Sequence, residues 1–496
     1  MFLYLCRFIV FAIFTALQAG GAVSIAKRVV PFRQNVCDTS PNDPTYSSNQ
    51  WAYEMISLEK AWDISIGSRN VNVAIIDSGV MKLHNDLVNN CASYFYATYD
   101  HDSTCGTNSW YDSDNHGTRV AGILGAEGNN DLGVCGVCWK TSMVPLSCYD
   151  TYGLDHDSYT ADAISTATLS NIPIINFSMA YSDSIDSAIE TNIRNYNGLF
   201  VCSAGNTYPG VDIDSNTNIN IYPSELTNID NLISVGALAS DGTIYPSSCY
   251  GATSVDLFAP GDDAITTTNV QNSYSTISQT SCAAPFVAGT AALLKSINPS
   301  LTTAQLKSAI LDNVDVQSNL IGKCVTGGRL NAFKAAQAVI PFLNGTTTRS
   351  VDGQGYNWVK IIIDSPSTYT FSLSANYFSL SLTLSTSTSS YVVPLQSANI
   401  ESGQASCSIT HTFRAAGTYY LRVKSNNTAN SVCNYTLTST FDSYHYHSFN
   451  GPIIPIDGQY HGRECVCGEI GMIMTHIAKP NNPNVCFACG GYIGFN

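Results

Sequence analysis

Charged residues are scarce in this chain of 496 residues. They make up 12% of the chain, with 22 lysines and arginines against 37 aspartates and glutamates, and the formal charge is −15 without any block of like charge. Because nucleic-acid phosphates require clustered Lys and Arg, this composition argues against a nucleic-acid partner. An acidic surface rich in Ser, Thr and Asn instead favours a secreted protein.

Apolar runs of membrane-spanning length are also missing. Residues 1–22 contain Arg7 and then an apolar stretch over 8–17, which is too short for a transmembrane helix of about 20 residues. We therefore predict a signal peptide over 1–22, cleaved near Ala19 or Ala22, with an uncleaved anchor as the alternative. No later segment is expected to cross a membrane. The predicted location is extracellular or in the lumen of the secretory pathway, without a membrane anchor.

Cysteines, in contrast, are frequent, at 17 in the chain. Losing Cys6 with the signal peptide leaves sixteen, an even number in an oxidising compartment, which predicts several disulfides of unknown connectivity. N-x-T sequons in polar stretches further indicate a secreted glycoprotein; they begin at Asn344, Asn426 and Asn434.

The chain is too long for one ordinary domain, so two or three folded units are expected. After a short segment over 23–45, β-branched runs alternate with helical patterns from 46 to 340. Continuous apolar strands separated by helices predict an α/β fold with a parallel sheet covered on both faces. Ligands of such folds bind beyond the carboxyl ends of the strands. The strand-like runs cover 71–77, 142–150, 172–180, 198–206 and 231–238.

Beyond this region the pattern changes to Ser/Thr-rich alternation over 345–440, which predicts an all-β sandwich. The tail, 441–496, is rich in Cys, His and Gly. Its ECVCG and CFACGG stretches have spacings that fit no standard zinc ribbon, although His461 and His476 lie nearby. In a secreted chain two disulfides are favoured over zinc.

Three polar residues stand at the ends of apolar elements: Asp77, His116 and Ser281. An acid, an imidazole and a hydroxyl are what nucleophilic acyl transfer requires, because a serine hydroxyl attacks only when a histidine accepts its proton and a carboxylate orients that histidine. Each residue alone is more often a turn former or a helix cap. Their order along the chain, Asp then His then Ser, matches one of the known triad arrangements.

Four motifs in order carry a resemblance to the subtilisin-like serine proteases, or subtilases (peptidase family S8). They are AIIDSGV, NHGTRVAGI, VCSAGN and TSCAAPFVAG, where the last motif of the family usually reads GTSMAAP. The resemblance implies a three-layer subtilisin-like catalytic domain over 46–340. It also implies that Asp77 orients the imidazole, His116 acts as general base and then general acid, Ser281 forms the acyl-enzyme, and Asn206 stabilises the oxyanion.

The same resemblance predicts the substrate and metal sites. An extended peptide would pair with the strand that contains Ser178, Met179 and Ala180. HNDL and GNNDLGV resemble the segments that hold a structural calcium ion in the family, which assigns Asp86 and Asn130 as oxygen ligands, with an ordinary turn as the alternative. Ligands from the amino-terminal segment, near Asn49 or Gln50, could not be placed. Asp183 lies near an acidic pocket residue of kexin-like enzymes, but a solvated or capping acid is favoured there.

Two residues beside Ser281 differ from the family pattern. Cys282 replaces the usual Met and should face the protein body, so packing is favoured over a second nucleophile. Gln279 replaces a glycine where the backbone passes close to the substrate pocket, which affects specificity more than activity.

Full propeptides are usual in subtilases, but only about twenty residues separate Ala22 from the catalytic region. The β module resembles the pre-peptidase carboxyl-terminal domains of bacterial proteases, and Cys407 and Cys433 within it are expected to pair. The leading hypothesis is a secreted serine endopeptidase, monomeric, acting on proteins or peptides. The alternative is a weak or inactive secreted binding protein with the subtilase fold.

Overall fold

The structure is a computed structural model that describes residues 40–92, 112, 114–150, 153–352, 355–364, 366–376, 379–389, 393–401, 403–427 and 432–441, and the backbone of short strands between 453 and 486. The predicted signal peptide and most of the segment over 23–45 lie outside the described residues.

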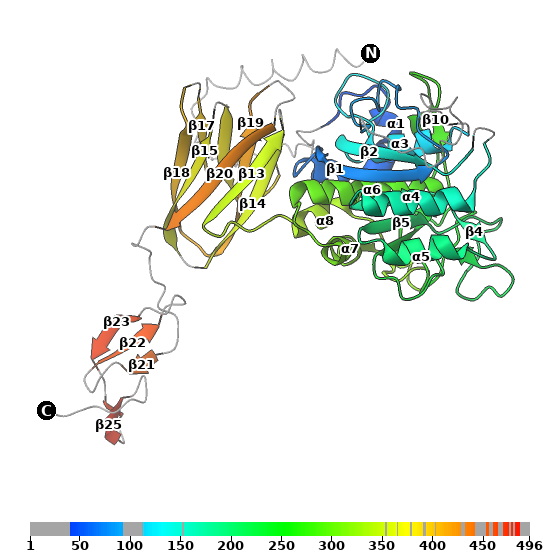
Figure 1. The fold of residues 1–496 in the computed structure, drawn as a ribbon. Helices are drawn as coiled ribbons and strands as arrows, with labels where there is room; N and C mark the ends of the chain where they lie inside the picture. Colours follow the sequence, from blue (N-terminus) through cyan, green and yellow to red (C-terminus); the bar gives the residue numbers. More distant parts are fainter. Residues whose placement is uncertain are drawn as a thin grey trace, which may run out of the picture. The chain divides into compact units, whose positions relative to one another are not determined.

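An eight-stranded sheet forms the centre of the amino-terminal part (Figure 1). Neighbouring strands from β12 to β2 run parallel, and β11 is antiparallel at one edge. The predicted parallel α/β sheet is therefore present. In spatial order the strands are β11 (Asp315–Val316), β12 (Gly328–Arg329), β8 (Leu257–Pro260), β7 (Leu232–Leu238), β5 (Leu199–Ser203), β3 (Ile174–Phe177), β1 (Gly67–Asp77) and β2 (Lys140–Ser147).

Helices cover both faces of this sheet, which makes three layers (Figure 1). In β1, Val73 and Ile75 pack into a core with α3 (His116–Gly125) and α6 (Thr280–Ile297). Because side chains alternate along a strand, Ala74 and Ile76 face the opposite core, formed with α4 (Asp157–Leu169) and α5 (Ser187–Asn195). Burial on both faces explains the continuous apolar strands.

The other elements of this part are short. They are α1 (Tyr46–Met55), α2 (Leu58–Trp62), α7 (Thr303–Leu311), α8 (Ala332–Ala338), β4 (Tyr181–Ser182), β6 (Ile221–Tyr222), β9 (Ala264–Thr267) and β10 (Tyr274–Ile277). Among the described helices, α6 alone is long and apolar enough to cross a membrane, contrary to the expectation that no later segment has that length. Because 83% of it is buried inside the protein, it serves as the central core helix.

Two four-stranded antiparallel sheets follow, in the orders β13-β20-β15-β18 and β14-β19-β16-β17. Both sheets contribute to one buried core that includes Phe371 and Leu437 from the first and Ile361 and Leu421 from the second. This is the predicted all-β sandwich. Its strands are β13 (Thr346–Asp352), β14 (Tyr356–Ile363), β15 (Ser367–Ala375), β16 (Leu380–Ser385), β17 (Gln396–Ile400), β18 (Ser406–Phe413), β19 (Gly417–Ser425) and β20 (Val432–Phe441).

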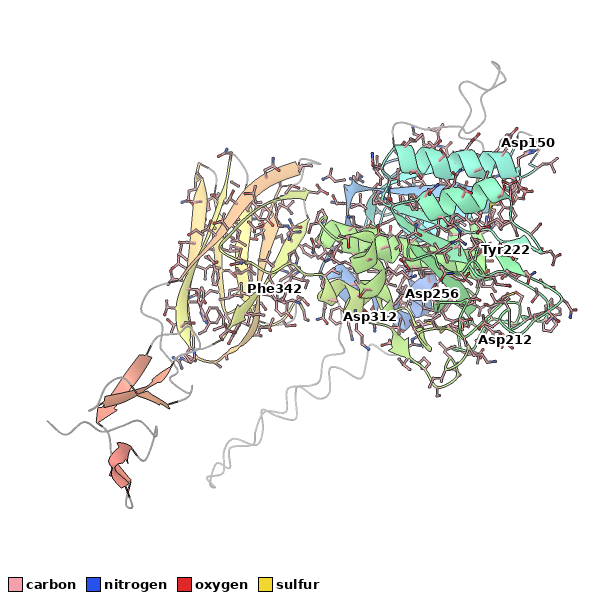
Figure 2. All side chains as sticks on the ribbon, turned by 60° about the horizontal axis from the view of Figure 1, so that its bottom comes forward. Asp150, Asp212, Tyr222, Asp256, Asp312 and Phe342 are labelled. Carbon is pink, nitrogen blue, oxygen red and sulfur yellow. The ribbon has the colours of Figure 1, made fainter. Side chains whose placement is uncertain are left out.

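The segment between α8 and β13 runs along β14. The Leu343 N–H donates to the carbonyl of Lys360 (2.8 Å), and the Lys360 ammonium lies 5.0 Å from the centre of the Phe342 ring. Phe342 is labelled in Figure 2, which shows the side chains of both parts.

The prediction of a disulfide between Cys407 and Cys433 is wrong. Cys407 on β18 pairs with Leu373 on β15, whose other partner is Leu437 on β20, four residues from Cys433. The two cysteines are thus two strand spacings of about 4.8 Å apart and also offset along the strands, too far for a disulfide with Cα atoms within about 7 Å.

Other disulfides are likewise missing from the described side chains, where every cysteine is a free thiol. Eight of the ten are buried and pack as small apolar side chains: five in the two cores that flank the eight-stranded sheet, two in a smaller core and one in the core of the β-sandwich. The free thiols are Cys91, Cys135, Cys138, Cys148, Cys202, Cys249, Cys282, Cys324, Cys407 and Cys433.

Short strands continue into the tail, for which only backbone is described. They are β21 (Ile453–Pro455), β22 (Tyr460–Glu464), β23 (Ile470–Thr475), β24 (Ala478–Lys479) and β25 (Asn482–Cys486). The preference for disulfides over zinc in the tail concerns side chains outside the described residues and stays a prediction.

Candidate active site

Asp77 and His116 are joined by a hydrogen bond. Asp77 is the last residue of β1 and is 1% exposed, and its Oδ1 lies 2.7 Å from Nδ1 of His116, the first residue of α3. The same oxygen accepts the N–H of Ser78 (2.8 Å). A carboxylate bound to Nδ1 leaves Nε2 of the imidazole as the proton acceptor.

The start of α3 is fixed against the end of β1 by Ser78. Its hydroxyl donates to Oδ1 of Asp112 (2.7 Å) and accepts the N–H of Gly117 (2.9 Å). A Cβ atom at position 117 would lie 2.1 Å from the carbonyl oxygen of Gly79, so only glycine allows this approach. Asp112 also accepts the N–H of Thr118 (2.8 Å). These contacts hold His116 beside Asp77.

Ser281 lies in the first turn of α6 and is bonded twice to Ser178. The Ser281 hydroxyl donates to the Ser178 carbonyl (3.0 Å), and the Ser178 hydroxyl donates to the Ser281 carbonyl (3.1 Å). Ile76 is in register with Phe177, so Asp77 at the end of β1 and Ser178 just after β3 lie at the same edge of the sheet. Asp77, His116 and Ser281 are thus gathered at the carboxyl edge of the sheet. In this structure the Ser281 hydroxyl points at a carbonyl and not at His116.

Asn206 lies three residues beyond the end of β5, is exposed, and has its side-chain oxygen fixed by Thr280. Its Oδ1 accepts both the backbone N–H (3.1 Å) and the hydroxyl of Thr280 (3.0 Å). Because a backbone N–H can only donate, the oxygen must face Thr280, and the amide NH₂ is turned away as a donor. The N–H groups of Thr280, Cys282 and Ala283 are bonded to Asn206 and to the Gln279 carbonyl, so the backbone N–H of Ser281 is the further donor of this turn. The helix dipole favours an anion there.

Nearby carboxylates raise the basicity of His116. Burial lowers its pKa, but the charge of Asp77, the hydrogen bond to it, and the charges of Asp114 and Asp112 outweigh burial and raise the pKa to about 9. Asp112 itself is buried, which raises its pKa. The imidazole is therefore a stronger base than a free histidine.

The predicted substrate-pairing segment leaves the sheet. β3 ends at Phe177, so Ser178, Met179 and Ala180 continue it without ladder bonds, whereas a strand was expected up to residue 180. Exposure rises along the segment, from a buried Ser178 to an exposed Ala180, and the Met179 carbonyl accepts the Ser203 hydroxyl (3.0 Å).

Cys282 is fully buried beside Ser281, and burial raises its pKa, which confirms its packing role. Gln279 adopts φ 77° and ψ −170°, a conformation that is otherwise almost restricted to glycine. The sequence identified this residue as unusual but gave no indication of its backbone conformation.

Asp86 and Asn130, the predicted metal ligands, are in contact. Asn130 donates its amide to Oδ1 of Asp86 (2.9 Å), and the Val134 N–H donates to Oδ2 (2.9 Å). Asn130 Oδ1 accepts the Leu132 N–H (2.9 Å), so its side chain would have to turn to offer oxygen to a cation. Asn49, in contrast, is bonded to the backbone of Ile265 and not to this cluster.

Asp43 joins this cluster and was missed in the sequence. It is 4% exposed; its Oδ2 accepts the Asn129 N–H (2.8 Å), while its Oδ1 is buried without a hydrogen-bond partner among the described residues. Burial raises the pKa of Asp43, the hydrogen bond from Asn129 lowers it, and the charge of Asp86 raises it further. The resulting pKa is about 6. An unpaired buried carboxylate oxygen near a second carboxylate is chemistry that suits a hard cation. The sequence clue is SPNDP, the Asn-Asp pair between two prolines.

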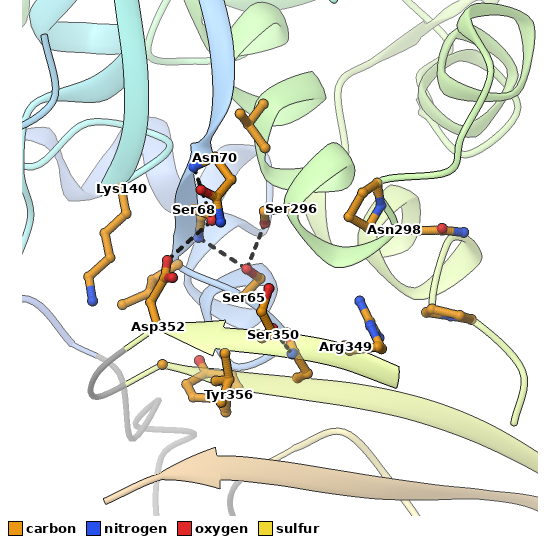
Figure 3. Close-up of a pocket in the computed structure, with 18 of the residues that line it drawn as sticks. Ser65, Ser68, Asn70, Lys140, Ser296, Asn298, Arg349, Ser350, Asp352 and Tyr356 are labelled. Atoms are coloured by element: carbon orange, nitrogen blue, oxygen red, sulfur yellow. Dashed lines mark hydrogen bonds between the residues drawn. The ribbon is translucent and has the colours of Figure 1, made fainter. Parts of the chain in front are cut away.

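A separate cavity of about 460 Å³ contains none of the predicted site residues. It lies between the start of β1, the end of α6, and β13 with β14, and Figure 3 shows Ser65, Lys140 and Asp352 among its walls.

Known proteins are similar to this chain over its α/β part. Residues 68–348 match the model of the subtilase family. The chain is 33% identical over 300 residues to the thermophilic serine proteinase of Bacillus sp. (strain AK1), covering 60% of this chain and 69% of that protein. Thermitase of Thermoactinomyces vulgaris is 32% identical over 301 residues, covering 60% and 99%.

A longer alignment is found with an extracellular protease of Xanthomonas campestris pv. campestris, 30% identical over 458 residues, covering 79% of this chain and 75% of that protein. Among solved structures, a protease of Pseudoalteromonas arctica superposes with a TM-score of 0.51 at 27% identity, covering 61% of this chain and 100% of that one.

Proposed function

Because the chain belongs to the subtilase family, we propose that it is a secreted serine endopeptidase that cleaves peptide bonds with Asp77, His116 and Ser281. The observation that carries the proposal is the 2.7 Å bond between Asp77 and His116 at the same sheet edge as Ser281. Relatives named as serine and extracellular proteases support the reaction class and secretion.

In the proposed reaction the Ser281 hydroxyl turns from the Ser178 carbonyl towards Nε2 of His116. His116 accepts its proton as Oγ attacks the scissile carbonyl carbon, and Asp77 stabilises the imidazolium that forms. His116 then protonates the leaving amine, and the acyl-enzyme remains on Ser281. Water, deprotonated by His116, releases the acid and regenerates the hydroxyl.

The oxyanion is stabilised by the Asn206 amide and by the backbone N–H of Ser281. Thr280 supports this role because it occupies the amide oxygen and leaves only the NH₂ for substrate. The exposed end of 178–180 would pair with an extended peptide, which favours unfolded or loop segments as substrates. We further propose that the protein is a monomer and that the β-sandwich is a module similar to pre-peptidase carboxyl-terminal domains.

Casein digestion tests the proposed function. The purified full chain should generate new peptide amino-termini inside casein, detected by mass spectrometry, and Ser281→Ala should generate none. A folded wild type that matches Ser281→Ala would contradict the endopeptidase and favour the alternative, an inactive binding protein with this fold.

Activity should depend on pH through His116. Only the neutral imidazole accepts the Ser281 proton, so kcat/KM should rise about tenfold per pH unit below the pKa and level off above about 9. Asp114→Asn removes a charge that raises this pKa and should shift the midpoint to lower pH. A wild-type midpoint near 6.5, unmoved by Asp114→Asn, would contradict the assigned electrostatics.

We also propose a structural calcium ion held by Asp43, Asp86 and Asn130. The unpaired Asp43 oxygen supports this site, and an ion there would offset the repulsion between the two carboxylates and tie the amino-terminal segment to the domain. It would have no part in the reaction.

Calcium should raise the melting temperature by about 5–10 °C at roughly 100 times Kd. Protons compete for Asp43, so the shift should weaken as the pH falls below about 6. Asp43→Asn should abolish the shift without lowering stability in EDTA, because it removes a buried charge. Asp241→Asn, at an exposed turn, should keep the wild-type shift. Equal shifts in both variants would rule out this site.

A further inference from the structure

Gln279 adopts a backbone conformation that is sterically unfavourable for a residue with a side chain. Its φ of 77° combines with ψ of −170° at the N-cap of α6. Most of the other non-glycine residues with positive φ are Asn or Asp, which tolerate the left-handed region, and the ψ of Gln279 lies outside that region. Such a conformation persists only where the surroundings impose it, and it lies two residues before Ser281.

The surroundings hold Gln279 at three points. Its N–H donates to the carbonyl of Gly261 (2.8 Å), and its carbonyl accepts the N–H of Cys282 (3.1 Å) in the first turn of α6. Its side-chain amide donates to the hydroxyl of Ser247 (3.2 Å), which is 6% exposed. The first two bonds use backbone atoms that any residue has, whereas the third requires glutamine.

Ser247 belongs to the segment that supports Asn206. The Ser247 carbonyl accepts the N–H of Thr207 (2.9 Å), and Ser248 forms a bridge with Asn206. The side chain of Gln279 therefore links the N-terminus of α6, which contains Ser281, to the segment of Ser247 and Ser248 that is bonded to Asn206 and Thr207.

The ψ angle of Gln279 also sets the direction of the next peptide group. The carbonyl of that peptide caps α6, while its N–H, from Thr280, donates to Oδ1 of Asn206. A rotation about ψ would turn the Thr280 N–H away from Asn206 and leave only the Thr280 hydroxyl beside the amide oxygen. Because a hydroxyl can also accept a hydrogen bond, the NH₂ would no longer have one fixed direction.

We propose that Gln279 is a positioning residue of the oxyanion site: its bond to Ser247 fixes the strained backbone that directs Thr280 onto Asn206. This rests on the proposed function. It assigns a role to the residue that replaces the usual glycine, where sequence alone indicated an effect on specificity.

Peptide hydrolysis by full-chain variants tests the proposal. Gln279→Ala and Ser247→Ala should each lower kcat roughly 3–10-fold, which is the effect of losing one neutral hydrogen bond, and should leave KM nearly unchanged. Because both changes remove the same bond, the kcat of the double variant should fall no further than that of either single variant. Gln279→Gly relieves the backbone strain, so the melting temperature of this variant should be no lower than that of wild type. Its kcat should still fall, because the bond to Ser247 is gone. Gln396→Ala, an exposed glutamine on β17, should match wild type.

The deciding comparison uses the Asn206→Ala background. There, Gln279→Ala should change kcat less than about twofold, because the group it orients is gone. A loss that is the same with and without Asn206, or wild-type kcat in both single variants, would overturn the positioning role while leaving the protease intact. A wild type that cleaves nothing would instead overturn the proposed function itself.

Discussion

His116→Ala is expected to lower kcat by about 10⁶-fold, the size of loss found when the triad histidine or serine of a subtilisin is replaced. The physical reason is that no other described base is bonded to a buried carboxylate at this sheet edge, and without one the Ser281 hydroxyl stays protonated. KM should change little, because the imidazole acts mainly on the transition state. Initial rates on a chromogenic peptide measure the loss.

If the three residues act together as a triad, the losses of kcat caused by single replacements should not add up in a double variant. Ser281→Ala should lose about as much as His116→Ala, and the double variant should lose no more, because each change disables the same proton transfer. The matched control is His156→Ala, which breaks a similar pair with the half-buried Asp150 (3.0 Å) just beyond the end of β2 and should keep wild-type kcat. Additive losses, or an equal loss in His156→Ala, would contradict the assignment.

Asn206→Asp is expected to lower kcat by about 10²–10³-fold, the loss found when one oxyanion donor is removed from a subtilisin. Aspartate is nearly isosteric and still offers an oxygen to Thr280, but an acceptor replaces the NH₂ that would face the oxyanion. The change therefore removes the donor while keeping the packing.

The measurement is kcat and KM for the same chromogenic peptide. Asn206→Ala should show a similar loss in kcat with KM nearly unchanged, and Asn319→Ala, which removes an exposed amide bonded to a loop carbonyl, should match wild type. A loss confined to KM would place Asn206 in ground-state binding and not in the oxyanion site.

Much of the α/β part could be predicted because the patterns that specify its strands, helices and motifs lie within short stretches of the sequence. Continuous apolar strands such as 71–77 are buried on both faces, which predicts a parallel sheet, and a strand that ends in Asp77 delivers its side chain to the carboxyl edge. The motifs around His116 and Ser281 are short and contiguous. The structure places Asp77, His116 and Ser281 at one edge of the sheet.

Contacts between distant segments could not be predicted. Asp43 approaches Asp86 only because the amino-terminal segment packs beside residues 129–134, and no periodicity indicates that. The pairing of Cys407 with Cys433 was wrong because alternation predicts strands but not their order in a sheet. Likewise, sequence identified Gln279 as unusual, but only the backbone angles and Ser247 show what the residue holds.

Covalent labelling with a fluorophosphonate tests the central claim most directly, because the reagent reacts with a serine only when a base activates it and an oxyanion site receives the phosphoryl oxygen. The purified full chain should gain one adduct, mapped by mass spectrometry to Ser281, and labelling should disappear in Ser281→Ala and fall steeply in His116→Ala. A correctly folded wild type that gains no adduct, or gains it at another serine, would contradict the account.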